Sequence, residues 1–224
     1  MDSAFGLPLV ELGGLAIFLE DQEILPWRHL EPQVPLEEYA SRDLSESDLK
    51  EMRAFSPKIE VSTLDHPNGS VFHGFRTRGR RWAVVFTLLP GDLIPVVAGY
   101  LHGADSVMVT LPAGNLSDKD LNWESCAIRE FTEETGILLR SVNPLSKEIF
   151  AAGGQSYMHY RSFLGNPRLP VLPRLQRLDD TEKLRRFLMP LSDWLSYLQV
   201  YSAESCSIST TYLALQQLDR LRIS

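Results

Sequence analysis

The chain has 224 residues, of which 44% are hydrophobic and 23% charged, and its formal net charge is −7. This length suits one large domain, or one domain with an accessory segment, and the composition is ordinary for a globular protein with its own core. The acidic balance argues against nucleic acid or an anionic membrane surface as the main partner. It leaves room for a nucleotide, because a metal ion can bring phosphates to an acidic pocket.

The N-terminal apolar run over residues 4–19 does not read as a targeting or membrane segment. Glu11 interrupts it, proline and glycine lie inside it, and no basic residue precedes it. The two cysteines, Cys126 and Cys206, match neither a metal pattern nor a disulfide framework. We therefore expect a cytoplasmic protein with no membrane partner.

Residues 1–55 are expected to form an N-terminal, β-rich extension whose role the sequence does not assign, with one short helix over 43–55. From residue 56 the pattern changes to short β-type runs, and Asn68-Gly69 is a strong tight-turn signal between the first two of them. The predicted strands cover residues 58–64, 70–79, 80–89, 93–101 and 106–114.

One acidic helix follows these strands, over residues 122–135, with Gly136 as its expected C-terminal stop. Two more β-type runs and a proline-rich loop lead to two C-terminal helices, predicted over 191–201 and 209–221. Strands, one helix, more strands and then helices are typical of an α+β fold, in which a mixed β-sheet is sandwiched between helices.

The acidic helix has a face suited to a hard cation. Glu130 and Glu134 are one turn apart and Glu133 joins the edge of their face, while Arg129 is four residues before Glu133 and can pair with it. Carboxylates that converge from one helix face suit Mg²⁺, which takes its remaining ligands from water and substrate phosphates. Gly114 in the preceding loop allows a close backbone approach, and a carbonyl there could complete the coordination.

The stretch from Gly114 to residue 137 resembles the Nudix box, G-x5-E-x7-R-E-U-x-E-E-x-G-U, in which U is an apolar residue. The second half, REFTEETGI, fits it residue by residue from Arg129. The first half departs from it, because Asp120 stands where the pattern has Glu and lies one residue too far from Arg129. Counting back from Arg129 instead puts Leu121 at that position.

The run before the box, ending in LPAG, is similar to that of ADP-ribose pyrophosphatases of the Nudix superfamily, and the likeness extends over residues 58–218. It implies a Nudix domain over 56–224 and a homodimer in which residues 56–80 exchange between subunits. It also implies hydrolysis of a nucleoside diphosphate derivative with Mg²⁺ or Mn²⁺. The implied metal ligands are Glu130, Glu134, Glu133 and the carbonyl of Ala113, while Arg129 orients Glu133 and Gly114 approaches the substrate.

The resemblance also implies a general base on a loop after the box. Glu182 is the candidate, with Asp180 and Glu148 as rivals, and a solvated loop residue is the plainer interpretation of Glu182. Arg76 and Arg78 belong to a basic cluster that could meet phosphates or a partner subunit, or could be an exposed strand end.

The substrate is left open by a further departure from the family. Leu101 stands where the family carries an arginine that contacts the diphosphate, so ADP-ribose, a nucleotide sugar and another diphosphate all remain candidates. The competing interpretation is a Nudix-fold module that senses a nucleotide without cutting it, since altered boxes mark such modules. A scaffolding role for residues 1–55 has no positive support.

Overall fold

The computed structural model describes residues 3–26, 28, 45–46, 58–65, 71–153, 156–178 and 183–221. The chain divides into two compact units, one of residues 1–26, 81–151 and 159–224, the other of residues 27–80 and 152–158. The predicted turn at Asn68-Gly69 lies outside the described residues, as do all but two residues of the predicted helix over 43–55.

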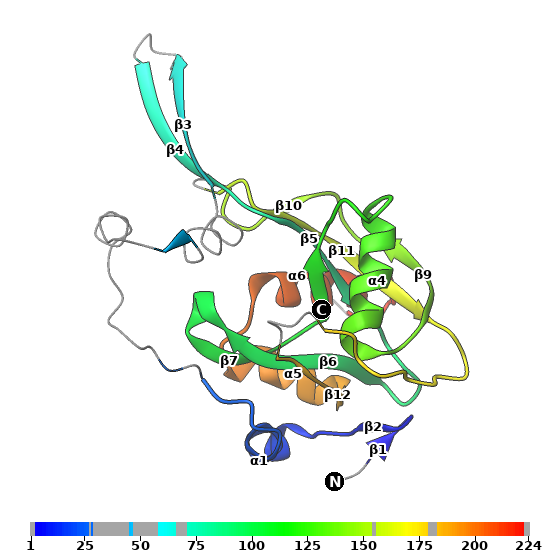
Figure 1. Cartoon of the computed structure of the whole chain (residues 1–224). Helices are drawn as coiled ribbons and strands as arrows, with labels where there is room; N and C mark the ends of the chain where they lie inside the picture. Colours follow the sequence, from blue (N-terminus) through cyan, green and yellow to red (C-terminus); the bar gives the residue numbers. More distant parts are fainter. Residues whose placement is uncertain are drawn as a thin grey trace. The chain divides into compact units, whose positions relative to one another are not determined.

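The larger unit contains a mixed sheet with the strand order β10-β11-β5-β8, and β9 also pairs with β11 (Figure 1). Strand β11 runs parallel to β5, whereas the other pairs in this sheet are antiparallel. The strands are β5 (Arg81–Phe86), β8 (Ala113–Asn115), β9 (Leu139–Pro144), β10 (Ile149–Phe150) and β11 (His159–Pro167). A mixed sheet is what the alternation of strands and helices in the sequence predicts.

A second, antiparallel sheet in the same unit has the order β12-β6-β7. Its strands are β6 (Leu93–Leu101), β7 (Ser106–Thr110) and β12 (Arg185–Pro190), and the short helix η2 (His102–Ala104) joins the first two. The predicted single strand over 106–114 is wrong in its extent, because the chain pairs with β6 up to Thr110 and then with β5 from Ala113. Pro112 lies at this change of partner, and its carbonyl accepts a hydrogen bond from the Val85 amide at 3.0 Å.

Helices cover both faces of the mixed sheet, as Figure 1 shows for the larger unit. Helix α4 (Trp123–Thr135) packs on one face and α6 (Ser205–Gln217) on the other, while α5 (Leu191–Val200) packs on β12 and β6 of the second sheet. Side chains of β5 point alternately to the two faces, as expected for a strand. Ala83 and Val85 join the apolar cluster beneath α4, and Val84 and Phe86 join the cluster beneath α5 and α6. The expected sandwich of a sheet between helices is confirmed.

The first residues of the chain contribute to this core, which the sequence analysis did not foresee. They form β1 (Ser3–Ala4), β2 (Leu7–Pro8), η1 (Leu12–Gly14) and α1 (Leu15–Asp21). Phe18 on α1 is only 1% exposed, and its ring lies 4.8 Å from that of Phe187 on β12. The amide of Val10 donates to the carbonyl of Leu188 at 2.9 Å, so residues beside β2 extend the edge of β12.

Helix α6 packs on the sheets through buried hydroxyl groups. Ser207 Oγ accepts from the Leu111 amide at 3.1 Å, and the Oγ atoms of Thr210 and Ser162 are 2.7 Å apart. Thr211 Oγ1 accepts from Trp194 Nε1 at 2.9 Å. Each of these hydroxyls is buried together with a hydrogen-bond partner, so its burial does not carry the free-energy cost of an unpaired polar group.

The smaller unit contains an antiparallel pair of strands, β3 (Lys58–Asp65) and β4 (Val71–Arg78). Arg76 and Arg78 on β4 both pair with Glu60 on β3, at 2.7 and 3.3 Å. The two arginines are half-exposed, so the ion pairs contribute little to stability.

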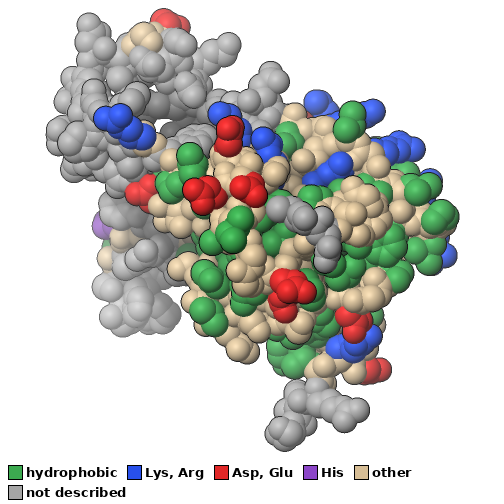
Figure 2. All heavy atoms as spheres, turned by 90° about the horizontal axis from the view of Figure 1, so that it is seen from below, with side chains coloured by type: hydrophobic (Ala, Val, Ile, Leu, Met, Phe, Trp, Pro, Cys, Tyr) green, Lys and Arg blue, Asp and Glu red, His purple; other side chains and the backbone are tan. Residues whose placement is uncertain are grey.

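Figure 2 shows acidic side chains at several separate places on the face drawn, among apolar and neutral groups. Among the described residues, no helix is both long and apolar enough to cross a membrane.

Candidate functional site

Local signals at both ends fix the position of helix α4. Asn122 and Ser125 form a reciprocal capping box, in which the Ser125 amide donates to Asn122 Oδ1 at 2.8 Å and the Asn122 amide donates to Ser125 Oγ at 3.0 Å. Gly136 ends the helix in the left-handed conformation, with a φ of 71°. The predicted helix and its glycine stop are confirmed, and these caps set which residues of α4 face the loop before it.

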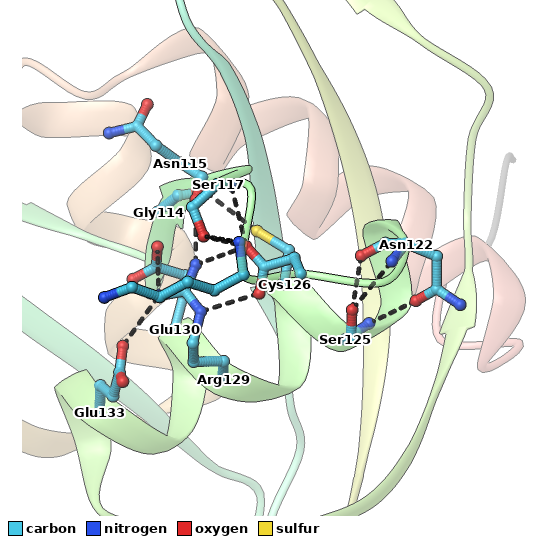
Figure 3. Close-up of polar contacts among 11 residues, drawn as sticks. Gly114, Asn115, Ser117, Asn122, Ser125, Cys126, Arg129, Glu130 and Glu133 are labelled. Atoms are coloured by element: carbon cyan, nitrogen blue, oxygen red, sulfur yellow. Dashed lines mark hydrogen bonds and ion pairs between the residues drawn. The ribbon is translucent and has the colours of Figure 1, made fainter.

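Two carboxylates of α4 meet the backbone of β8 at adjacent residues. The amide of Ala113 donates to Glu134 Oε2 at 3.0 Å, and Glu134 is only 5% exposed. A Cβ atom on Gly114 would overlap the carboxylate of Glu130, so any other residue at this position of β8 would require that carboxylate to move. The predicted close approach at Gly114 is therefore explained by Glu130, which Figure 3 shows beside it.

Arg129 links three carboxylates and the loop (Figure 3). Its Nη1 lies 2.9 Å from both Glu130 Oε1 and Glu133 Oε2, and its Nη2 donates to the carbonyl of Asn115 at 3.0 Å. Its Nε and Nη2 each donate to one oxygen of Asp120, both at 2.8 Å. A guanidinium held by so many acceptors has a fixed orientation, so Arg129 also fixes the positions of Glu130 and Glu133.

The structure assigns the uncertain acidic position of the box to Asp120. Its side chain is 3% exposed and also accepts hydrogen bonds from the amide and hydroxyl of Ser117, both at 2.9 Å. These bonds, those from Arg129 foremost, hold the pKa of Asp120 well below its usual range. Leu121, the alternative from counting back, is 95% exposed. The loop has one residue more than the Nudix box, and Asp120 has one methylene fewer than the Glu of the box. Asp120 nevertheless forms a bidentate ion pair with Arg129.

The predicted site residues fall into three groups. Those from the box and the loop before it lie together in the larger unit: Ala113, Gly114, Arg129, Glu130, Glu133 and Glu134. Arg76 and Arg78 lie in the smaller unit, paired with Glu60. Glu182 and Asp180 lie outside the described residues.

Glu148, the third candidate base, has partners of its own. It pairs with Arg161 at 3.2 Å and lies 3.8 Å from His159 Nε2, both on β11.

The C-terminal end of α4 is held by Gln176 and Arg177, which follow the proline-rich loop and lead into the polar segment that carries Glu182. The amide of Arg177 donates to the carbonyl of Glu133 at 2.9 Å, and the side chain of Gln176 donates to the carbonyl of Glu134 at 2.7 Å. These bonds satisfy two carbonyls that a helix leaves without partners at its end. No local sequence signal identifies them, because both partners are distant in the chain.

Cys126 lies on the same helix but its thiol is not suited to nucleophilic chemistry. Its Sγ is 3.6 Å from the carbonyl of Gly114, and burial raises the pKa of the thiol to about 12. Burial likewise raises the pKa of the Cys206 thiol to about 12. Both cysteines are free, and at neutral pH both stay protonated.

The donor set of the acidic face bears on whether it can hold a metal ion. Among the described residues, no three His, Cys, Asp or Glu side chains are grouped so that they alone could hold a metal ion. Mg²⁺ does not need such a group, since it commonly takes one or two carboxylates and completes its shell with water and substrate phosphates. Glu130 and Glu134 supply two hard oxygen donors beside a backbone that a Cβ would block, so this part of the structure fits a divalent ion that arrives with a phosphate ligand.

Comparison with known proteins agrees with this arrangement at the level of the fold. The crystal structure of an ADP compounds hydrolase is similar to this chain, with a TM-score of 0.62 and 20% sequence identity over 74% of this chain and 90% of that one. No protein-family profile and no curated protein sequence match the chain. The protein thus has an α+β architecture with a Nudix-like fold, and this structural neighbour is a hydrolase.

Proposed function

We propose that this protein is a metal-dependent hydrolase that cleaves the diphosphate of a nucleoside diphosphate derivative, with ADP-ribose or a nucleotide sugar as the leading substrates. The observation that carries the proposal is the meeting of Glu130 and Glu134 at the adjacent backbone of Ala113 and Gly114. Arg129 offsets part of the negative charge of Glu130, and a divalent ion between these carboxylates and the substrate would neutralise the charge of a diphosphate before water attacks it.

The metal is Mg²⁺ or Mn²⁺ in this proposal, held by Glu130, Glu134 and the carbonyl of Ala113, with Glu133 as a third carboxylate. When bound, such an ion neutralises charge on phosphate oxygens and lowers the pKa of an attacking water. Gly114 lets the substrate's phosphates approach the backbone closely. Arg129 acts as a positioning residue, because its side chain is used by Asp120, Glu130 and Glu133.

Glu182 remains the predicted general base. Its support is the anchoring of the chain that leads to it, since the Arg177 amide is bonded to the Glu133 carbonyl. Glu182 is five positions after Arg177, which keeps its Cα within about 17 Å of the Cα of Arg177 even for a fully extended chain. Glu148 is the weaker rival because Arg161 already pairs with it.

We propose that Arg76 and Arg78 contact the substrate or a partner subunit. We also propose that the protein forms a homodimer through residues 56–80 and that it is cytoplasmic. Support for the dimer comes from the β3–β4 pair, where Val61 and Val71 lie on the same face and are 61% and 59% exposed. An isolated two-stranded hairpin is only marginally stable in water, and a second copy would cover these apolar side chains.

The proposal is tested by measuring the hydrolysis of diphosphate compounds by the purified protein. Product release from ADP-ribose and a panel of nucleotide sugars is measured with Mg²⁺, with Mn²⁺ and with EDTA, for the wild type, Glu134→Gln and the control Glu20→Gln. Glu20 is an exposed residue of α1 far from α4 in sequence. We expect metal-dependent turnover that Glu134→Gln lowers by at least about a hundredfold and Glu20→Gln leaves unchanged.

Two results would contradict the proposal. Equal turnover by the wild type and Glu134→Gln would remove the acidic face of α4 from the chemistry. Tight nucleotide binding without product under any metal would instead identify a nucleotide sensor.

A further inference from the structure

A hollow of about 590 Å³ lies on the larger unit at the opposite end of α4 from Glu134. Its lining comes from Glu124 in the first turn of α4, from Arg161 on β11, and from the end of β9 through β10, including Glu148 and Phe150. A hollow of this size is in the usual range for small-molecule sites. The lining does not include Ala113, Gly114, Glu130 or Glu134, so the hollow is separate from the acidic face of α4.

Arg161 is fixed in orientation at the wall of this hollow. Its guanidinium carbon lies 5.0 Å from the centre of the Trp123 ring, and its Nη2 donates to Glu148 Oε1 at 3.2 Å. Its Nε is buried and, among the described residues, has no hydrogen-bond partner. The side chain is nevertheless 31% exposed, so part of a pre-oriented planar donor faces solvent.

Glu148 places an acceptor directly beside this donor. Its side chain is 41% exposed, and it lies between Arg161 and the buried ring of His159. Phe150, which is 46% exposed, packs against the same His159 ring with 5.4 Å between ring centres. The wall therefore combines a fixed donor, an adjacent acceptor and an accessible aromatic face.

The charges of the lining argue against a simple anion as the occupant. Two acidic residues, Glu124 and Glu148, balance two basic ones, Lys147 and Arg161. A free phosphate would gain from the cations but would be repelled by the carboxylates at similar range. A neutral ring with an acceptor and a donor on one edge satisfies both members of the Arg161–Glu148 pair.

We propose that this hollow binds a purine base. Adenine presents N7 and its N6 amino group side by side, and guanine presents O6 beside N1–H, so either edge matches a donor next to an acceptor. The ring would stack on Phe150, as bases commonly do on aromatic side chains. A purine is favoured over a pyrimidine because its larger ring covers more of Phe150 and fills more of the hollow. The binding depends on the base alone and not on hydrolysis of a diphosphate.

The experiment uses nucleosides without phosphate, in EDTA, so that its outcome is independent of any hydrolase activity. Adenosine, guanosine and uridine are titrated into the full chain by calorimetry or NMR. The variants are Glu148→Gln, Arg161→Lys and the control Arg140→Gln, an exposed residue of β9 outside the lining. Thermal unfolding of each variant is recorded, and Glu148→Gln keeps the test valid if Arg161→Lys disturbs the packing on Trp123.

We expect saturable binding of at least one purine nucleoside, weakened about tenfold or more by Glu148→Gln and by Arg161→Lys and unchanged by Arg140→Gln. The proposal is overturned if neither purine nucleoside binds saturably, or if Glu148→Gln binds as tightly as the wild type. Equal affinity for uridine would overturn the assignment to a purine.

Discussion

The ion pair between Asp120 and Arg129 gives the sharpest prediction about this fold. Both carboxylate oxygens of Asp120 accept hydrogen bonds from Arg129 at 2.8 Å. The side chain of Asp120 is 3% exposed and that of Arg129 is 28% exposed. Asp120→Asn keeps the shape but turns an amide N–H₂ toward a guanidinium donor and removes the charge. Breaking a buried pair by removing one partner costs roughly 3–5 kcal/mol, and we expect the lower end, about 3 kcal/mol, because Glu130 and Glu133 remain beside Arg129.

The assay is urea unfolding at pH 7 together with a thermal melt. A loss of about 3 kcal/mol lowers Tm by roughly 6–12 °C in a protein of this size. Asp118→Asn is the matched control, since it makes the same charge change on an exposed residue of the same loop. If both variants unfold alike, the buried ion pair is not what holds the loop.

The same ion pair predicts that acid length and loop length are coupled. Asp120→Glu lengthens the side chain in a loop that already has one extra residue, so we expect it to destabilise the protein. Deleting Leu121, which is 95% exposed, in the Asp120→Glu background restores the spacing of the Nudix box. This double change should recover most of the lost stability. A double variant that is no more stable than Asp120→Glu alone would refute the idea that the shorter acid compensates for the extra residue.

Three further predictions concern the loss of stability at low pH, the role of Gly114 and the buried indole of Trp194. The pKa of Asp120 is lowered in the folded state. The stabilisation from the Asp120 carboxylate is therefore complete above the unfolded pKa of about 3.9 and is lost as the pH falls below it. In urea unfolding, the difference in free energy of unfolding between the wild type and Asp120→Asn should shrink between pH 6 and pH 3. Gly114→Ala should displace the Glu130 carboxylate and lower turnover of a diphosphate substrate by about a hundredfold, with unchanged kinetics contradicting the contact. Thr211→Val removes the acceptor of Trp194 Nε1, a fully buried group, and should cost about 1–3 kcal/mol in chemical unfolding, a loss that a Trp194→Phe background should largely remove.

Local signals in the sequence were sufficient for the acidic helix. Asn122 provides an N-cap, Gly136 provides a C-terminal stop, and the spacing of Glu130 and Glu134 sets one face, so the helix and its acidic face could be predicted without knowing the rest of the fold. Such signals depend only on residues within a few positions of each other.

Features that depend on distant partners were not predictable in the same way. The strand expected over 106–114 breaks because the chain leaves β6 and joins β5, and a sequence does not show with which strand a residue pairs. The packing of Phe18 against Phe187, and the bond from Arg177 to the end of α4, also join remote segments. In each case the residue type was compatible with several environments, and tertiary contact selected one of them.

The first half of the box shows why spacing alone is a poor guide to a site of this kind. A fixed-spacing pattern rejects the chain at its first acidic position, because both the residue type and the count to Arg129 differ. The physical requirement at that position is a buried carboxylate that holds the arginine between the loop and the helix carboxylates, and Asp120 meets it with two bonds of 2.8 Å. We predict that a Glu without the extra residue reaches the same guanidinium, so that the loop and the acid can change together while Glu130 and Glu133 stay in place. Related chains that escape sequence patterns should therefore be sought by this geometry, with loop length free to vary.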